Sequence, residues 1–168
     1  WMLPDHPAER IAGLASQLTR LWHDSDGRRV PRPDAKPTIV ELHKRGYTLG
    51  IIANAISTTE IPDWLKDDGL TEYFKAVILS SEFGRRKPDP YIFLEAASAA
   101  GTRPAVCAYV GDNPTRDVQG ARQAGFGMVL ILQADAPSTG ELLDARQRPD
   151  GFLHSCSELL DLFPPVAK

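Results

Sequence analysis

Short apolar runs alternate with amphipathic stretches along most of the chain. A nearly continuous apolar run is typical of a parallel strand that helices cover on both faces. Such runs predict strands at 47–53, 74–80, 105–111 and 127–133, with a short edge strand at 151–155. Strands that alternate with helices in this way indicate an α/β fold with a parallel sheet.

Helical periodicity fills the intervals between these strands. In the first helix, predicted at 5–23, Asp5 is placed to cap and apolar residues from Ile11 to Trp22 recur at helical spacing. The polar, proline-rich stretch 23–37 reads as a connector. Further helices are predicted at 38–46, 59–69, 89–101, 115–125, 139–147 and 157–163.

Composition narrows the class of protein. The 168 residues suggest one domain with a small appendage, and a net charge of −3 gives no basic surface for nucleic acid or an anionic membrane. The two cysteines form no zinc pattern and no disulfide framework. There is no apolar run of membrane length and no signal-peptide core, so we expect a cytoplasmic location. The oligomeric state is left open.

Polar and charged residues follow three of the predicted strands where each strand ends. Asn54 follows the first strand, and Lys87 lies in the loop after the second. Asp112 and Asp117 follow the third. Ligands of open parallel sheets bind beyond the carboxyl ends of the strands, so these side chains are expected along one edge of the sheet.

These residue types suit metal-assisted phosphate chemistry. Mg²⁺ prefers carboxylate oxygens, which makes Asp112 and Asp117 candidate metal ligands, with Asn113 as a helix cap. Lys87 is the candidate cation for a phosphoryl group. Each residue also has a structural interpretation. Asp117 could compensate a helix dipole, Asn54 could satisfy a turn, and Lys87 could be a solvated charge.

Residues 36–163 resemble the haloacid dehalogenase superfamily of phosphohydrolases. "LGIIAN", "KPDPYIF" and "GDNPTRD" resemble its second, third and fourth motifs, and "VQGARQAGFG" follows the last as in the family. The resemblance implies a Rossmann-like three-layer parallel sheet, Mg²⁺ and a small phosphorylated substrate. It makes Asp112 and Asp117 the metal-site acids, and it makes Lys87 the catalytic residue that stabilises the phosphoryl group and the charge of the nucleophile. It leaves Asn54, or a backbone amide, to replace in part a hydrogen-bond donor that holds the phosphate in the family.

Two departures from the family pattern matter. Ala53 stands where the family has a Ser or Thr that holds the phosphate. The family's first motif, an apolar strand and Asp-x-Asp-Gly-Thr, supplies the nucleophile and the general acid/base. "DSDG" at 24–27 is one candidate, but helical periodicity precedes it and Arg28 replaces the Thr. We therefore expect the catalytic strand to lie upstream of Trp1.

This interpretation divides the chain into two parts. Residues 1–35 are expected to be the remnant of a helical cap and its connector, and residues 36–168 an α/β core that lacks its first strand. Without that central strand, two apolar strand edges would face each other unpaired.

Several functions stay open. The first is a Mg²⁺-dependent phosphatase, and the second is a non-catalytic descendant that binds a phosphorylated ligand or a partner, which Ala53 and the missing motif favour. A dehalogenase is a further possibility within the family. A receiver domain would need an acidic pair after an early strand, and no nucleotide-binding glycine motif is present.

Overall fold

The computed structural model describes residues 7–26, 31–133 and 148–166. Contacts divide the chain into two compact units, with the boundary between Pro31 and Arg32. The first unit contains helix α1 (Ala8–Asp26). The prediction of a helix here is confirmed, but the helix continues three residues beyond its expected end. Asp24 therefore lies inside a helix and not after a strand, which removes the structural context that a nucleophile in "DSDG" would need.

The second unit carries all five described strands, in two parallel sheets. One sheet pairs β1 with β2, and the other has the order β3-β4-β5. The bounds are β1 (Leu49–Ala53), β2 (Phe74–Leu79), β3 (Ala108–Gly111), β4 (Met128–Leu132) and β5 (Gly151–Leu153). The five predicted strands are thus confirmed, with β5 at an edge. β3 begins later than expected because a 3₁₀ turn (Pro104–Val106) takes up the start of the apolar run.

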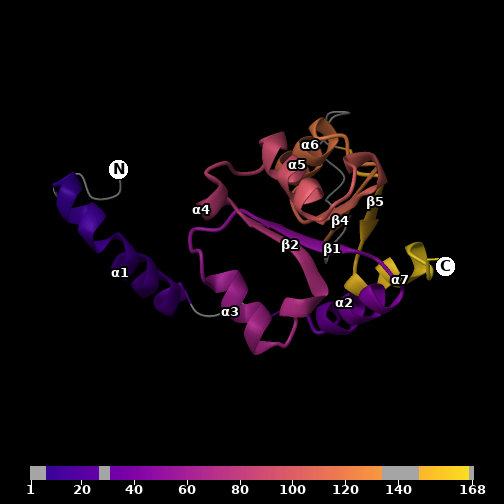
Figure 1. The fold of residues 1–168 in the computed structure, drawn as a ribbon, viewed down its shortest axis with the longest axis horizontal. Helices are drawn as coiled ribbons and strands as arrows, with labels where there is room; N and C mark the ends of the chain where they lie inside the picture. Colours follow the sequence, from indigo (N-terminus) through magenta and orange to yellow (C-terminus); the bar gives the residue numbers. More distant parts are fainter. Residues whose placement is uncertain (1–6, 27–30, 134–147, 167–168) are drawn as a thin grey trace. The chain divides into compact units, whose positions relative to one another are not determined.

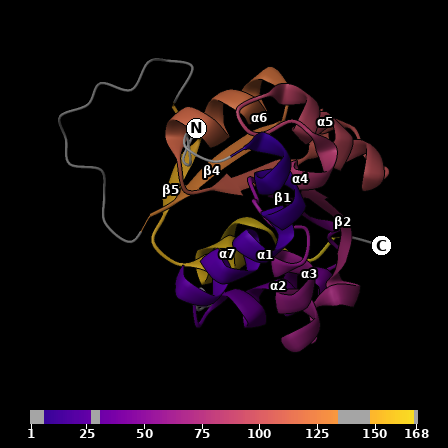
Figure 2. The ribbon, with the colours of Figure 1, turned by 90° about the vertical axis from the view of Figure 1, so that its left-hand side faces the viewer.

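Helices cover both faces of the strands (Figures 1 and 2). Helices α5 and α6 lie on one side, and α2, α3 and α7 lie on the other, which gives the three-layer arrangement that the sequence predicts. The bounds are α2 (Ala35–Lys44), α3 (Glu60–Asp67), α4 (Ser80–Phe83), α5 (Pro90–Ala99), α6 (Gln119–Gln123) and α7 (Leu159–Leu162), with 3₁₀ turns at Thr71–Tyr73 and Cys156–Glu158.

Three helix predictions differ from the structure in detail. The predicted helix at 115–125 begins as a π-helical turn (Pro114–Val118) before α6 takes over. Helix α4 was not predicted, because four residues are too few to show a periodicity. The predicted helix at 139–147 lies outside the described residues.

Two apolar clusters hold the second unit together, one on each side of the strands. The first centres on Phe93 of α5, whose ring meets Tyr109 and Phe126 edge-on at centroid distances of 5.0 and 5.8 Å. Gly120 of α6 lets this ring approach, since a Cβ there would overlap Cε2 of Phe93 and lie 2.9 Å from Cζ of the same ring. The second cluster consists of leucines from α2, β4, β5 and α7: Leu42, Leu130, Leu153 and Leu159.

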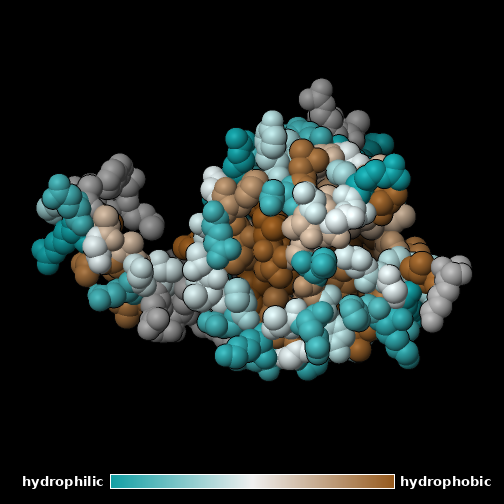
Figure 3. Space-filling view, in the orientation of Figure 1, coloured by the Kyte–Doolittle hydropathy of each residue, from teal (hydrophilic) through white to brown (hydrophobic). Residues whose placement is uncertain are grey.

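The two sheets are not joined by hydrogen bonds between described strands. β1 pairs with β2 alone and β3 pairs with β4 alone, so each has one unpaired edge among the described residues. Ile51, Ile52 and Val110 are only partly buried, although their apolar run is typical of a central strand. Figure 3 shows apolar side chains gathered on the surface of this unit in the region of β2. A split sheet is the arrangement expected if a central strand is absent.

Replacement of Phe93 by Ala should lower the free energy of unfolding by about 4 kcal/mol, because the fully buried ring leaves a cavity. Leu94 of the same helix is 39% exposed, and Leu94→Ala should cost about 1 kcal/mol. Urea unfolding measures both changes. Equal losses would contradict the central place of Phe93 in the core.

Candidate active site

An ion pair between Lys87 and Asp117 forms the centre of the site. The lysine Nζ lies 2.8 Å from the Asp117 Oδ1, and the two side chains are 8% and 0% exposed. Lys87 comes from the loop after α4, and Asp117 from the π-helical turn after β3. The structure therefore brings together two of the predicted site residues, and it excludes the interpretation of Lys87 as a solvated charge.

Asp117 is held on all sides by donors. Its Oδ2 accepts the backbone N–H groups of Asp112 and Asn113, each at 3.0 Å. Burial alone would raise the pKa of Asp117. The hydrogen bond and charge of Lys87 and the two backbone N–H groups more than offset this, and the pKa is lowered from its usual value of 3.8. Asp117 therefore stays ionised at neutral pH.

Gly111 permits this close packing. A Cβ at Gly111 would lie 2.6 Å from the Cβ, Cγ and Oδ2 of Asp117, closer than two side chains can approach. The glycine of the "GDNPTRD" motif thus has a steric reason: it lets the carboxylate fold back against the end of β3. The predicted cap is also present, since Asn113 Oδ1 accepts the Arg116 N–H at 2.9 Å.

Tyr109 is a site residue that the sequence did not reveal. Its hydroxyl accepts a hydrogen bond from Lys87 Nζ at 2.6 Å and donates to Asp117 Oδ1 at 3.3 Å. Burial, followed by the charge of Asp117, raises the pKa of Tyr109, so the hydroxyl keeps its proton. An ammonium has three donors, and Asp117 and Tyr109 use two of them. Among the described residues, the third N–H of Lys87 has no acceptor and could serve a ligand.

Asn54 holds the backbone of Lys87. Its Nδ2 donates to the Lys87 carbonyl oxygen at 3.0 Å, and its Oδ1 accepts the Lys87 N–H at 2.8 Å. Both functional groups of the side chain are therefore used within the protein. The expected position of Asn54 at the same edge as Lys87 is confirmed, whereas phosphate binding by Asn54 stays a prediction, and the geometry gives this residue a positioning role.

Asp112 lies at the open side of the site. Its side chain is 76% exposed, and its Oδ1 lies 3.0 Å from Nη2 of Arg116. No cluster of three or more His, Cys, Asp or Glu side chains that could hold a metal occurs among the described residues. Mg²⁺ needs only one or two protein carboxylates because it keeps several waters. Asp112 fits a direct ligand. Both oxygens of Asp117 are engaged within the protein, which gives this residue a role in ordering the loop, and metal binding by Asp117 stays a prediction.

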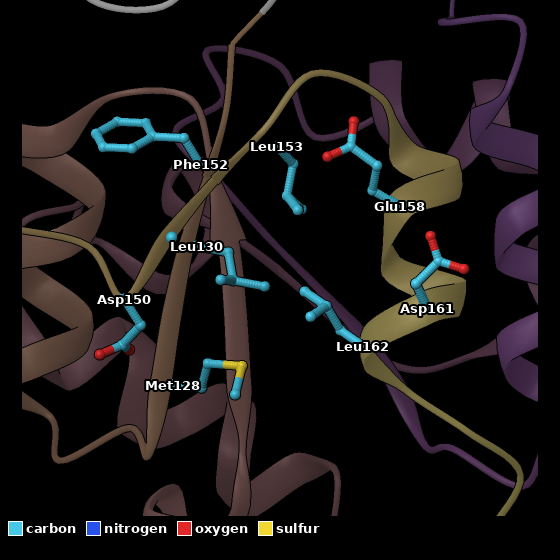
Figure 4. Close-up of a pocket in the computed structure, with 9 residues that line it drawn as sticks. Met128, Leu130, Asp150, Phe152, Leu153, Glu158, Asp161 and Leu162 are labelled. Atoms are coloured by element: carbon cyan, nitrogen blue, oxygen red, sulfur yellow. The ribbon is translucent and has the colours of Figure 1, made fainter.

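A cavity lies elsewhere in the second unit. A pocket of about 350 Å³ lies beside β4, β5 and α7, where apolar side chains are flanked by three carboxylates (Figure 4). These acids are Asp150, Glu158 and Asp161. Arg122 pairs with Asp150, and Glu158 accepts backbone N–H groups of the loop before α7. An acidic lining does not suit a phosphorylated ligand, so we place the active site at Lys87.

Replacement of Asp117 by Asn should lower the free energy of unfolding by about 3 kcal/mol at pH 7, because it leaves Lys87 buried without its counter-ion. The lowered pKa means that ionised Asp117 stabilises the fold above its unfolded value of 3.8 and that this contribution is lost as the pH falls through the folded value. The difference between the wild type and the variant should therefore shrink below about pH 4 in urea unfolding. The exposed Asp112→Asn is the control, and an Asp117→Asn as stable as wild type at pH 7 would contradict the assignment.

Replacement of Asn54 by Ala tests the positioning role in the absence of any ligand. It leaves the N–H and C=O of Lys87 without partners, and we expect a loss of about 2 kcal/mol in unfolding free energy. Thr58→Ala, at an exposed position of the same loop, should change it by less than about 0.5 kcal/mol. If Asn54 served only to bind phosphate, the ligand-free variant would keep its stability.

Comparison with known proteins identifies the family of the chain. The family model for haloacid dehalogenase-like hydrolases matches residues 7–125. A glyceraldehyde 3-phosphate phosphatase from Methanopyrus kandleri is 33% identical over 161 residues, which cover 92% of this chain and 66% of that protein. A phosphoserine phosphatase from Thermus thermophilus is 37% identical over 134 residues, or 79% of this chain and 51% of that protein.

Solved structures show the same likeness. A haloacid dehalogenase family phosphatase from Thermococcus onnurineus superimposes with a TM-score of 0.68 at 28% identity, covering 80% of this chain and 60% of that one. A 2-haloacid dehalogenase from Pseudomonas syringae gives a TM-score of 0.73 at 28% identity, covering 94% and 64%. The chain spans about half to two thirds of the length of these relatives. By family match, motifs and fold, the chain belongs to the haloacid dehalogenase-like hydrolases.

Proposed function

We propose that the whole protein is a Mg²⁺-dependent phosphatase that acts on a small phosphorylated substrate. The observation that carries this proposal is the buried Lys87–Asp117 pair beside the exposed Asp112. A buried ammonium with one free donor, next to an accessible carboxylate, suits a phosphate that is held between a cation and a metal ion. The phosphatases among the relatives support the same reaction.

The residues of this chain take separate roles in the proposed site. Asp112 would hold Mg²⁺, which when bound supplies positive charge to the phosphoryl oxygens. The free N–H of Lys87 binds a phosphoryl oxygen and offsets its charge. Asp117 and Tyr109 fix the ammonium of Lys87, and Asn54 fixes its backbone. Catalysis here depends on placement and charge, which these contacts provide before the substrate arrives.

The nucleophile in this proposal lies on a strand outside the described residues. The unpaired edges of β1 and β3 would each pair with it, which would join the two sheets into one. By resemblance to the family, an aspartate on that strand attacks phosphorus while the P–O bond to the alcohol breaks. A second aspartate protonates the alcohol oxygen, and water then hydrolyses the aspartyl-phosphate. Residues 1–35 would be the remnant of a cap that selects the substrate.

A second candidate function is binding without catalysis, and Ala53 favours it. The structure offers limited compensation for the missing hydroxyl, since Ser57 and Thr59 bond each other and Ser80 bonds the backbone of Ala55. A backbone amide of this loop would have to take its place.

The cellular location is a separate question. No described helix combines the length and the apolar content that a bilayer crossing requires. We propose a cytoplasmic location on composition and charge.

Hydrolysis of p-nitrophenyl phosphate tests the proposal. The full-length protein should be active with Mg²⁺ and inactive with EDTA, and Asp112→Asn should lower kcat/KM roughly 100-fold because the exposed metal ligand is lost. Arg122→Gln, which alters a surface ion pair remote from these residues, should keep its activity. Chloride release from 2-chloropropionate with no phosphate release would show a dehalogenase. Neither activity, with phosphate still bound, would favour the binding function.

A further inference from the structure

Arg116 is a charged residue of the site for which neither the motif nor the proposed reaction accounts. It lies in the π-helical turn, one residue before Asp117 and four after Asp112. Its Nη2 is 3.0 Å from Asp112 Oδ1, and its Nε is 3.8 Å from Asp117 Oδ1. The guanidinium therefore lies against both carboxylates that the sequence predicts as metal ligands.

The placement of Arg116 is more than a surface ion pair between neighbouring turns. Its Nε is buried and has no hydrogen-bond acceptor among the described residues, although the side chain as a whole is 36% exposed. Nη2 donates a hydrogen bond to Asp112 Oδ1, but the buried Nε without an acceptor opposes the placement, so hydrogen bonding explains it only in part. Charge also favours it, because the guanidinium faces two carboxylates in a partly desolvated place.

The charges of the site balance without a metal ion. Lys87 neutralises Asp117, and Arg116 neutralises Asp112, in each case at 3.0 Å or less. A divalent cation at Asp112 would meet a carboxylate oxygen that a guanidinium already occupies. It would also be repelled by that guanidinium at short distance. A carboxylate has a second oxygen, so the competition between the two cations is chiefly electrostatic, and the repulsion is relieved when the guanidinium moves away from Asp112.

We propose that Arg116 is a built-in competitor of the metal ion: it holds Asp112 in the metal-free protein and is displaced when a divalent cation binds. The inference rests on the proposed function, since it takes Asp112 as a metal ligand. It deepens that function by giving this chain a residue that sets how tightly the metal is held. Asp117 is not displaced in this exchange, because Lys87, Tyr109 and two backbone N–H groups hold it independently.

Calorimetric titration of Mg²⁺ into the metal-free full-length protein, at fixed ionic strength and without substrate, tests the proposal. Arg116→Gln should lower the dissociation constant for Mg²⁺ roughly threefold to tenfold, because it removes both the competing ion pair and the repulsion. Arg116→Lys keeps the charge and should stay within about twofold of wild type. Arg122→Gln removes the same charge from a comparable pair with Asp150 and is the matched control. An unchanged or larger dissociation constant for Arg116→Gln would overturn the proposal.

A second measurement needs no variant that might fold poorly. The ¹H–¹⁵N signal of Arg116 Nε in the wild-type protein should shift on addition of Mg²⁺, with the midpoint found by calorimetry. A signal that stays unmoved while Mg²⁺ binds would also overturn the proposal.

The experiments distinguish failure of the proposed function from failure of the proposal about Arg116. A wild-type protein that neither binds Mg²⁺ nor hydrolyses p-nitrophenyl phosphate defeats the proposed function and this inference with it. If the wild type is a Mg²⁺-dependent phosphatase but Arg116→Gln leaves the dissociation constant for Mg²⁺ unchanged, only the inference about Arg116 fails.

Discussion

The buried ion pair between Lys87 and Asp117 is the interaction on which the rest of the site depends. Taking two charges out of water is costly, and it is tolerated only where geometry and further hydrogen bonds compensate. The structure supplies that compensation from every direction: Tyr109 from β3, backbone N–H groups from the loop after it, and Asn54 from the end of β1. A buried ion pair is weak evidence for stability as such, and this is consistent with the binding or catalytic role that we propose for Lys87.

The sequence was sufficient to predict where the strands and most of the helices lie along the chain, because each is marked by a strong hydrophobic period or by a cap. The predicted helix at 89–101 illustrates this, and in the structure Asp89 caps α5 by accepting the Tyr91 N–H at 2.9 Å. Segment ends were less predictable. The start of β3 became a 3₁₀ turn, and the helix after it became a π-helical turn, because local hydrogen bonding decides such details and periodicity does not record it.

The candidate site was predictable as a set of positions but not as a set of contacts. Strand ends and motif spacing placed Asn54, Lys87 and Asp117 on one edge, and the structure joins them. Tyr109 was hidden because an aromatic residue in an apolar strand is indistinguishable from core, and here it serves both the core and the site. The sequence also did not show that Asp117 would be buried and Asp112 exposed. Gly111 lets one fold inward, while the other points outward, and sequence spacing alone does not distinguish them.

The position of Lys87 between the two sheets has a mechanical consequence. Its main chain is fastened by Asn54 to the end of one sheet, and its ammonium is fastened by Asp117 and Tyr109 to the end of the other. Lys87 therefore links the ends of the two sheets, and a shift of one sheet against the other would disturb these contacts. The ammonium of Lys87 is in place only when the ends of the two sheets are aligned. The alignment of the sheets and the geometry of the proposed site therefore depend on the same contacts.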